Sequence, residues 1–290
     1  MISMLKNKTV SVILPNYNYA KYIAKRIDEV LAQTYPVSEI IVLDDASTDG
    51  SQEIIEKEIA RIKERHPEFN IKCEYNQQNS GNPFSQWQKG IQLATSDYIW
   101  ICELDDSAKP TLLKTAMAAF DDEKVVLSYC NSRIVGNNGK PLLKDNLRRV
   151  KDAFRKKHSA GSYIVDGLEE INNNLAVYNS IPNVSAAVFR KQPDLIKYLD
   201  QAKQYRLCGD WYFYLMIAST GKIAYSSRVL NYHRVHQKSV TGSTSLSDRF
   251  AETKEIHQFV KNNFTINDST IERINKIEAN LAKKWKIKDN

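Results

Sequence analysis

Apolar residues in the first hundred positions of the chain alternate between short continuous runs and helical stripes. The runs are rich in β-branched residues and predict buried strands, whereas the stripes, with apolar residues three or four positions apart, predict amphipathic helices. The predicted strands are Thr9–Leu14, Glu39–Leu43, Asn70–Tyr75 and Asp97–Cys102, and the predicted helices are Tyr22–Gln33, Ser51–Arg65 and Trp87–Ala94. This alternation is typical of a doubly wound α/β fold with a mostly parallel sheet.

The rest of the chain follows a less regular pattern. Further strands are predicted at Val125–Cys130, Asn183–Phe189 and Lys222–His233, and a further helix at Asp210–Ala218. From Asp248 onward the chain is predicted to be helical, with one apolar stripe formed by Ile271, Ile274, Ile277, Leu281 and Trp285. A stripe of this kind among lysines favours a packing face over a membrane anchor.

Length and composition are those of a globular protein. The 290 residues, 42% of them hydrophobic, are enough for one large domain. No apolar run reaches membrane-spanning length, and Met1–Lys8 lacks the apolar core of a signal peptide, so we expect a cytoplasmic protein. The four cysteines lie far apart with no Cys-x-x-Cys pair, which argues against a disulfide framework or a thiolate metal site.

The net charge of +7 is compatible with nucleic acid, an anionic membrane face or a phosphorylated substrate as partner. The most basic stretch, Arg148–His158, fits a solvated surface as well as a binding patch. The aromatic residues are expected to be mostly internal, whereas a nucleic-acid binder would combine them with a basic surface. We therefore expect no nucleic-acid partner.

Acidic residues follow two of the predicted buried strands. Asp44 and Asp45 come directly after one strand, and Glu103, Asp105 and Asp106 come directly after another. Ligands of doubly wound sheets bind beyond the carboxyl ends of the strands, so both groups lie where a site is expected. Helix capping by Asp49 or Ser51 is one interpretation of the first group, but capping does not need paired aspartates. A carboxylate there can accept from a nucleobase imide or a ribose hydroxyl.

The second group concentrates three carboxylates within four residues, Glu103 to Asp106. These charges repel one another unless a positive group lies among them. A divalent cation, Mn²⁺ or Mg²⁺, bound through oxygen ligands and completed by substrate phosphates, is the economical solution. The alternative is an exposed acidic turn.

Two later features also suggest a phosphate-containing site. Asp210 opens an aromatic helix, where it either complements the helix dipole or acts as a general base. His236 is either structural or a metal ligand, while Arg234 or Lys238 is placed to neutralise a diphosphate. The glycine-rich signatures of P-loop NTPases and of typical Rossmann dehydrogenases are both absent.

These motifs, in this order, resemble the inverting family-two glycosyltransferases with the GT-A fold, of the bacterial surface-polysaccharide type. The resemblance is carried by Ser11–Asn18, Gln33–Pro36, Glu39–Gly50, Ala94–Ile99, the acidic group and Pro110, and it spans roughly residues 8 to 240. It implies a GT-A catalytic domain over 1–240, with a nucleotide-sugar half at about 8–110 and an acceptor half at about 111–240. A helical extension over 241–290 would follow.

The resemblance also implies roles for individual residues. Pro15, Tyr17 and Asp45 would hold the nucleoside, and Glu103, Asp105 and Arg234 would bind the rest of the nucleotide-sugar. Asp105, Asp106 and His236 would bind the metal. Asp210 falls on the catalytic base, which removes the proton of an acceptor hydroxyl.

Two departures from the family pattern stand out. Glu103 replaces the usual aspartate, and Gln86–Gly90 lacks the Arg-Asn pair of many relatives. The implied donor is a UDP- or dTDP-sugar, and the implied acceptor is a glycan or a lipid-linked glycan, with peripheral contact to an anionic membrane as a hypothesis. A nucleotidyltransferase that makes a nucleotide-sugar and a non-catalytic sugar-binding module remain as alternatives.

Overall fold

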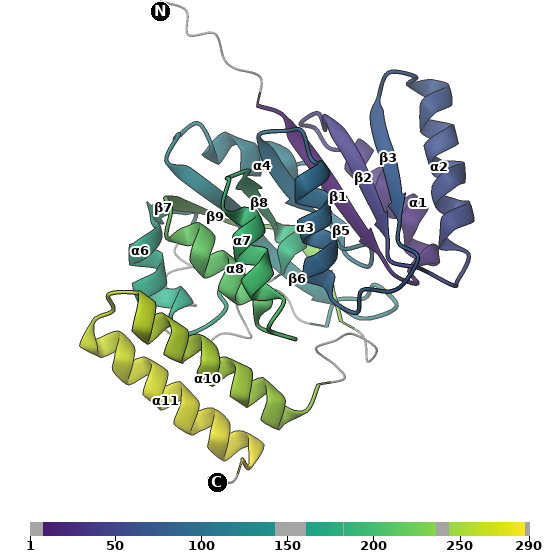
Figure 1. Cartoon of the computed structure of the whole chain (residues 1–290). Helices are drawn as coiled ribbons and strands as arrows, with labels where there is room; N and C mark the ends of the chain where they lie inside the picture. The colour runs from purple at the N-terminus through teal and green to yellow at the C-terminus, as the bar shows by residue number, and fades with distance from the viewer. Residues whose placement is uncertain (1–7, 143–160, 182, 236–243, 288–290) are drawn as a thin grey trace, which may run out of the picture.

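A nine-stranded mixed sheet with helices on both faces forms the centre of the computed structural model, which describes residues 8–142, 161–181, 183–235 and 244–287 (Figure 1). The strand order is β3-β2-β1-β4-β8-β6-β9-β5, and β7 pairs with β9 outside this path. The predicted architecture, a doubly wound mixed sheet flanked by helices and followed by C-terminal helices, is confirmed, but the sheet is not mostly parallel, because four of its eight strand pairings are antiparallel.

The N-terminal half has the strand and helix alternation that the sequence predicts. Its elements are β1 Val10–Asn16, α1 Ala20–Leu31, β2 Glu39–Asp44, α2 Ser51–Arg65, β3 Asn70–Tyr75, α3 Pro83–Leu93 and β4 Tyr98–Ile101. The four strands are parallel, and the register pairs Asn16 with Asp44, so β1 and β2 end at the same level. Helix α3 begins four residues before the predicted Trp87, because Asn82 caps it and Pro83 occupies its first turn.

Alternate residues of the strands pack into two separate cores. Val12 and Leu14 of β1 face the core that contains α1, α2 and α4, whereas Ile13 faces the core that contains α3, α7 and α8. Helix α3 lies very close to the sheet, because a Cβ on Gly90 would fall 2.5 Å from Ile13 Cγ2. This close packing fixes α3, whose side chains reach the acidic residues at the strand ends.

The C-terminal half adds shorter and antiparallel strands. Its elements are β5 Ser107–Ala108, α4 Leu112–Ala119, β6 Val125–Val135, β7 Tyr163–Asp166, α6 Gly167–Glu170, a π-helical turn Ile171–Leu175, a 3₁₀ turn Val184–Ala186, β8 Ala187–Arg190, α7 Leu195–Ala202, α8 Gly209–Ala218 and β9 Lys222–Arg234. The predicted strand at Asn183–Phe189 was partly wrong, because it begins as a 3₁₀ turn before β8. The short elements β5, β7 and α7 were not predicted.

The C-terminal helices α10 (Leu246–Asn263) and α11 (Asp268–Trp285) run side by side as a hairpin, drawn in yellow-green and yellow in Figure 1. Ile256, Val260 and Ile274 are fully buried in the same core as α8. The packing interpretation of the α11 stripe is therefore confirmed at Ile274. The predicted domain boundary at residue 240 lies outside the described residues, as does the basic stretch Arg148–His158.

The described residues contain no helix that combines the length and the apolar character needed to cross a bilayer. All four cysteines are free, as the sequence predicts, and Cys102 and Cys130 are buried in the cores.

Candidate active site

The loops that follow β1 and β2 are bound to each other at the carboxyl edge of the sheet. Asn18 has a left-handed backbone with φ of 58°. Its N–H donates to Ser47 Oγ (2.9 Å), and its side-chain oxygen accepts from the N–H of Thr48 (2.8 Å). Of the two predicted nucleoside contacts on the first loop, Pro15 is buried, whereas Tyr17 is 47% exposed and presents its ring to solvent.

Two aspartates, at the end of β2 and in the loop that follows it, accept hydrogen bonds from both loops. Asp44 is fully buried and accepts from Asn16 Nδ2 (2.6 Å) and from the N–H of Ser47 (3.1 Å). Asp49 accepts from the N–H of Ala20 at the start of α1 (2.9 Å) and from the N–H of Ser51 (3.1 Å). Asp49 thus accepts from the first N–H of both α1 and α2, as its predicted role implies, although the N-cap residue of α2 is Gly50. Asp44 is a structural residue at the end of β2.

Asp45 is only 5% exposed and lies in a dense set of donors. Its Oδ1 accepts from Asn76 Nδ2 (2.7 Å) and Gln86 Nε2 (2.8 Å), and its Oδ2 accepts from Ser80 Oγ (2.7 Å). The N–H of Ser80 also donates to the same carboxylate. These bonds fix the orientation of Asp45 and were not foreseen from the sequence. The role of Asp45 in reading the base stays a prediction.

Glu103, the unusual acid of the motif, is held by α3. Its Oε1 accepts from Trp87 Nε1 (3.1 Å), and its backbone N–H donates to Ser185 Oγ (3.0 Å). Burial and the neighbouring Asp105 raise the pKa of Glu103 to about 8. The adjacent residues Gln86 and Trp87 of α3 therefore hold Asp45 and Glu103, respectively. Nothing in the sequence marks Trp87, since a tryptophan in an amphipathic helix is ordinarily a core residue.

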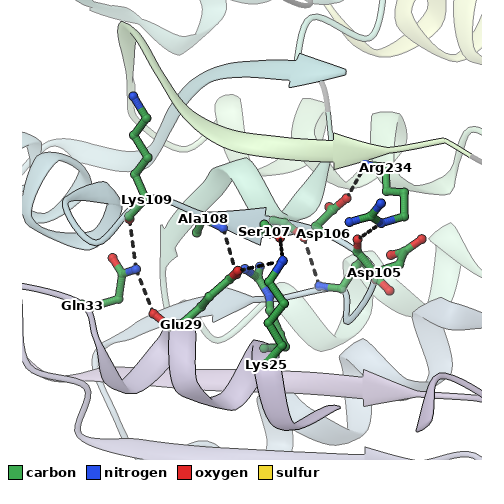
Figure 2. A network of polar contacts seen from close by, with 12 residues as sticks. Lys25, Glu29, Gln33, Asp105, Asp106, Ser107, Ala108, Lys109 and Arg234 are labelled. Carbon is green, nitrogen blue, oxygen red and sulfur yellow. Dashed lines mark hydrogen bonds and ion pairs between the residues drawn. The ribbon is translucent and has the colours of Figure 1, made fainter. Parts of the chain in front are cut away.

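Asp106 is buried and accepts from Asn183 Nδ2 and from the backbone N–H of Arg234 (2.9 Å). Burial raises the pKa of Asp106 against the opposing effect of these donors and of the cations nearby. Arg234 also donates from Nε to the backbone oxygen of Asp105 (2.7 Å) and from Nη1 to that of Gly136 (2.8 Å) (Figure 2). Arg234 thus stabilises the conformation of the acidic turn. Its contact with a diphosphate stays a prediction.

A buried arginine that sequence reasoning missed lies beside the acidic turn. Arg26 of α1 is 1% exposed, donates to Glu29 Oε2 (3.2 Å) and lies 5.5 Å from the ring of Trp100. Burial alone would lower the pKa of Arg26, but Cys102 and Asp106 together with Glu29 raise it. Arg26 supplies positive charge to the turn from within the protein.

Helix α1 also holds the chain that leaves the acidic turn, as Figure 2 shows. Glu29 Oε2 accepts from the N–H of Ala108 (3.1 Å), and Lys25 Nζ donates to Ser107 Oγ (3.2 Å). Gln33 Nε2 bridges the backbone oxygens of Glu29 (3.1 Å) and Lys109 (3.0 Å). The turn is therefore fixed on both sides, by α1 and by Arg234.

The acidic turn fits a divalent cation in its chemistry, although it is not a complete cage. Within the parts of the chain that the structure describes, no three His, Cys, Asp or Glu residues are grouped to hold an ion, and His236 lies outside those parts. Burial raises the pKa values of Glu103 and Asp106, and for Glu103 the charge of Asp105 adds to this effect, so a bound cation would favour the ionised forms of both carboxyl groups. Oxygen donors with excess negative charge suit a hard cation that takes its remaining ligands from substrate phosphates.

Asp210 stands at the start of α8, as predicted. Its Oδ1 accepts from the N–H of Trp211 (2.7 Å), and its Oδ2 accepts from Asn179 Nδ2 (3.1 Å). Burial raises the pKa of Asp210 to about 6, against the lowering effect of both bonds. One turn later, the buried Tyr214 lies close enough to Asp210 and Glu103 for both charges to raise its pKa. Asp210 and Glu103 therefore both lie near Tyr214.

Comparison with known proteins decides the family. The profile described as "Glycosyl transferase family 2" matches residues 11–171, more than half of the chain. The chain belongs to glycosyltransferase family 2. The first match among curated proteins is an uncharacterized glycosyltransferase of Nostoc sp., which is 26% identical over 260 residues, covering 89% of this chain and 74% of that protein.

Solved structures show that this family-2 glycosyltransferase has the GT-A fold of its relatives. Staphylococcus aureus TarS 1-349 in complex with UDP-GlcNAc has a TM-score of 0.66 at 20% identity, covering 96% of this chain and 73% of that one. The mannosyltransferase PcManGT of Pyrobaculum calidifontis, in complex with GDP-Man and Mn²⁺, has a TM-score of 0.58 at 19% identity, covering 94% and 69%.

The sequence matches of this glycosyltransferase to several curated relatives cover only part of the length of those proteins. Beyond the Nostoc protein, its matches span half or less of each of the next relatives. In TarS, named a poly(ribitol-phosphate) beta-N-acetylglucosaminyltransferase, the match is 29% identical over 133 residues, covering 45% of this chain and 22% of TarS. The family assignment favours sugar transfer over the nucleotidyltransferase alternative.

Proposed function

We propose that the protein is a metal-dependent, inverting glycosyltransferase that moves a sugar from a UDP- or dTDP-sugar to a hydroxyl of a glycan or lipid-linked glycan. The observation that supports this proposal is that Asp210 and Glu103 of the acidic turn both lie near Tyr214, so that the base candidate and the turn can serve one reaction. Asp210 has a pKa raised to about 6 by burial, which suits a general base at neutral pH. The acidic turn has the negative charge that a metal ion requires, and the metal ion would in turn bind the diphosphate.

In the proposed step, Asp210 removes the proton of the acceptor hydroxyl while that oxygen attacks the anomeric carbon from the side opposite the diphosphate. A new glycosidic C–O bond forms, and the bond between the anomeric carbon and the diphosphate oxygen breaks. The electron pair leaves with the nucleoside diphosphate, the proton stays on Asp210, and the configuration inverts. Asn179 keeps the carboxylate in one orientation.

Asp105, with Asp106 in support and His236, would hold Mn²⁺ or Mg²⁺. The ion would supply positive charge to the departing diphosphate. Burial and the charge of Asp105 raise the pKa of Glu103 despite the nearby Arg26, and an added cation would favour the ionised form of Glu103. The Mn²⁺ in the PcManGT complex supports this choice of metal.

The nucleoside would lie along the carboxyl ends of β1 and β2. Tyr17 would contribute its exposed ring, Pro15 the wall behind it, and Asp45 the acceptor for a uracil or thymine imide. The UDP-GlcNAc in the TarS complex favours a UDP-sugar. The likeness to TarS also supports a role in cell-surface polysaccharide synthesis, such as O-antigen or capsule, with the enzyme acting in the cytoplasm at the inner membrane face.

A panel of nucleotide-sugars tests this function. Thermal shift and nucleoside diphosphate release are measured for UDP-, dTDP- and GDP-sugars, with Mn²⁺, with Mg²⁺ and with EDTA. We expect a uridine or thymidine donor to raise Tm and to be turned over only with metal. Equal stabilisation by every base, or full turnover in EDTA, would contradict the proposal. Co-sedimentation with phosphatidylglycerol vesicles, compared with phosphatidylcholine vesicles, tests the membrane contact.

A further inference from the structure

The helix pair at the C-terminus reaches the loop that carries Asp210. Glu252 of α10 accepts from three consecutive backbone N–H groups in the loop between α7 and α8. These are Arg206 (3.0 Å) on Oε1, and Leu207 (2.8 Å) and Cys208 (2.9 Å) on Oε2. Cys208 directly precedes α8, and Asp210 is the second residue of that helix. One carboxylate thus binds the backbone of the three residues that precede Gly209 and the proposed base Asp210.

The opposite side of this segment is held by tight packing. A Cβ on Gly209 would fall 2.4 Å from Phe84 Cε2 and 2.5 Å from the backbone oxygen of Ala202. Gly209 is therefore pressed against α3 and the end of α7 and cannot move toward them. The loop lies between this wall and Glu252, so the side chain of Glu252 controls its freedom to move outward.

Helix α10 also contacts the first turn of α8 beyond Asp210. The ring of His257 packs edge-on against Trp211 at 5.5 Å, and His257 Nδ1 bonds Glu278 Oε1 of α11 (2.8 Å). The ring of Phe259 lies 4.9 Å from that of Tyr212. The extension is therefore joined to α8 by aromatic packing, and Glu252 is the charged contact of this interface that reaches the loop.

We propose that Glu252 is a positioning residue for Asp210, which holds the Arg206–Cys208 backbone and so fixes the base against the acceptor. The proposal rests on the proposed function, in which Asp210 is the base. Hydrogen bonds to a charged group are stronger than those to a neutral acceptor, and loss of the half-buried Glu252 carboxylate takes this partner from all three donors. The three bonds together are strong enough to decide the conformation of a short loop.

The charge of Glu252 has a second, measurable consequence. It raises the pKa of Asp210 in addition to the effect of burial. The other titratable groups around the two carboxylates include Tyr205 and Cys208 on the loop, Glu255 on α10, Glu103 of the acidic turn and Tyr214 on α8. Because Glu252 is the acid that raises the pKa of Asp210, its neutralisation should lower that pKa.

The test compares Glu252→Gln and Glu252→Ala with Glu255→Gln in the full-length chain. Glu255 is an exposed acid on the same helix, so its variant makes the same change in charge without touching the loop. We expect hydrogen–deuterium exchange at the amides of residues 206–208 to rise about 10-fold to 100-fold in both Glu252 variants, which corresponds to about one lost hydrogen bond to a charged group. Exchange across the rest of α8 and the Tm should change little, and Glu255→Gln should resemble wild type.

Two further readouts separate positioning of the base from simple support of the fold. Titration of the Asp210 carboxyl carbon by NMR should give a pKa below about 6 in Glu252→Gln. With UDP-GlcNAc and Mn²⁺ as the probe, UDP release should lose about 10-fold in kcat with little change in KM. The acidic limb of kcat should move to lower pH, and Glu255→Gln should keep wild-type values.

The outcomes distinguish this inference from the function on which it rests. Unchanged amide exchange and an unchanged Asp210 pKa in Glu252→Gln overturn the positioning role, whatever the activity. Faster exchange and a lower pKa, together with an Asp210→Asn variant that keeps full UDP release, support Glu252 as the anchor of the loop and refute Asp210 as the base.

Discussion

The acidic turn and the start of α8 contribute carboxylates to the proposed site in two different ways. In the turn, three acids lie within four residues, and two of them, Glu103 and Asp106, are bound by Trp87, Asn183 and Arg234. At α8 there is one acid, Asp210, bound by one amide and by its own helix. The turn therefore brings three carboxyl groups close together, whereas the start of α8 holds a single one.

The difference shows what each region is suited to do. Crowded carboxylates attract a cation, because each added positive charge relieves several repulsions and favours the ionised forms that burial disfavours. A single buried carboxylate with a pKa of about 6 instead attracts a proton at a useful pH. Substitutions in the two regions should therefore have different effects. Those in the turn should weaken binding of metal and donor, and those at the start of α8 should slow proton transfer.

Asp210→Asn should have the largest effect on turnover. Loss of a general base costs on the order of 10²–10⁴-fold in kcat, while donor affinity should stay unchanged because the turn is intact. Asp194→Asn is the matched control, since Asp194 also precedes a helix, α7, but is exposed and makes no capping bond. Transfer kinetics and nucleotide-sugar titration calorimetry measure both values. Near-normal kcat in Asp210→Asn would remove this residue from the mechanism.

Asp105→Asn should have the next largest effect, now on binding as well as turnover. Removing one charge from the turn should lower metal-dependent donor affinity and reduce kcat/KM on the order of 100-fold. Asp97→Asn tests the same change at the other end of β4, where Asp97 is exposed, and should behave as wild type. Donor titrations with and without Mn²⁺ provide the measurement. If Asp105→Asn keeps its Mn²⁺ response, the metal is bound elsewhere.

The sequence predicted the frame of both regions, because strands that end in acids leave a local pattern. The strands that carry Asp45 and Glu103, and the helix that carries Asp210, were found at nearly their observed bounds. The partners of these acids were not predicted. Arg26 and Trp87 resemble ordinary residues of amphipathic helices, and only the packing of α1 and α3 on the sheet brings them to the turn.

Asparagine and glutamine partners were equally invisible in the sequence. Asn179 and Asn183 lie in irregular chain between α6 and β8, where no periodic pattern indicates which way a side chain points. Gln86 reaches Asp45 from a different part of the chain. Contacts between residues far apart in sequence depend on the register of the sheet and the close packing of helices, and neither is encoded by residue type alone.

The pH dependence of kcat sharpens the comparison with a smaller effect. Because the base must be deprotonated, kcat should fall as pH drops below about 6, by about tenfold per unit, rather than near 4 as for an exposed aspartate. Asn179→Ala should move this limb to higher pH, since the bond from Asn179 favours the ionised form and lowers the pKa of Asp210. A limb that stays in place would show that another group titrates.

Trp87→Phe should have the smallest effect and tests whether the turn needs all of its internal donors. The substitution keeps an aromatic ring beside Phe84 and Phe213 but removes the N–H that binds Glu103 Oε1. A single such bond corresponds to about threefold to 30-fold in an equilibrium, and we expect the lower end in donor affinity because Glu103 can rebind through water.

Trp100→Phe provides the control for lost packing in that experiment. Trp100 is also buried, but its N–H donates to the backbone oxygen of Ser185 (2.9 Å) rather than to an acid of the turn. Both variants should lose stability through lost volume, and only Trp87→Phe should weaken donor binding at matched folded fraction. Equal weakening in both variants would mean that Trp87 acts on donor binding through packing alone. The hydrogen bond from α3 to Glu103 would then not be needed to hold the acidic turn. The turn and Asp210, which is held by Asn179 and by its own helix, would differ less than their contacts suggest.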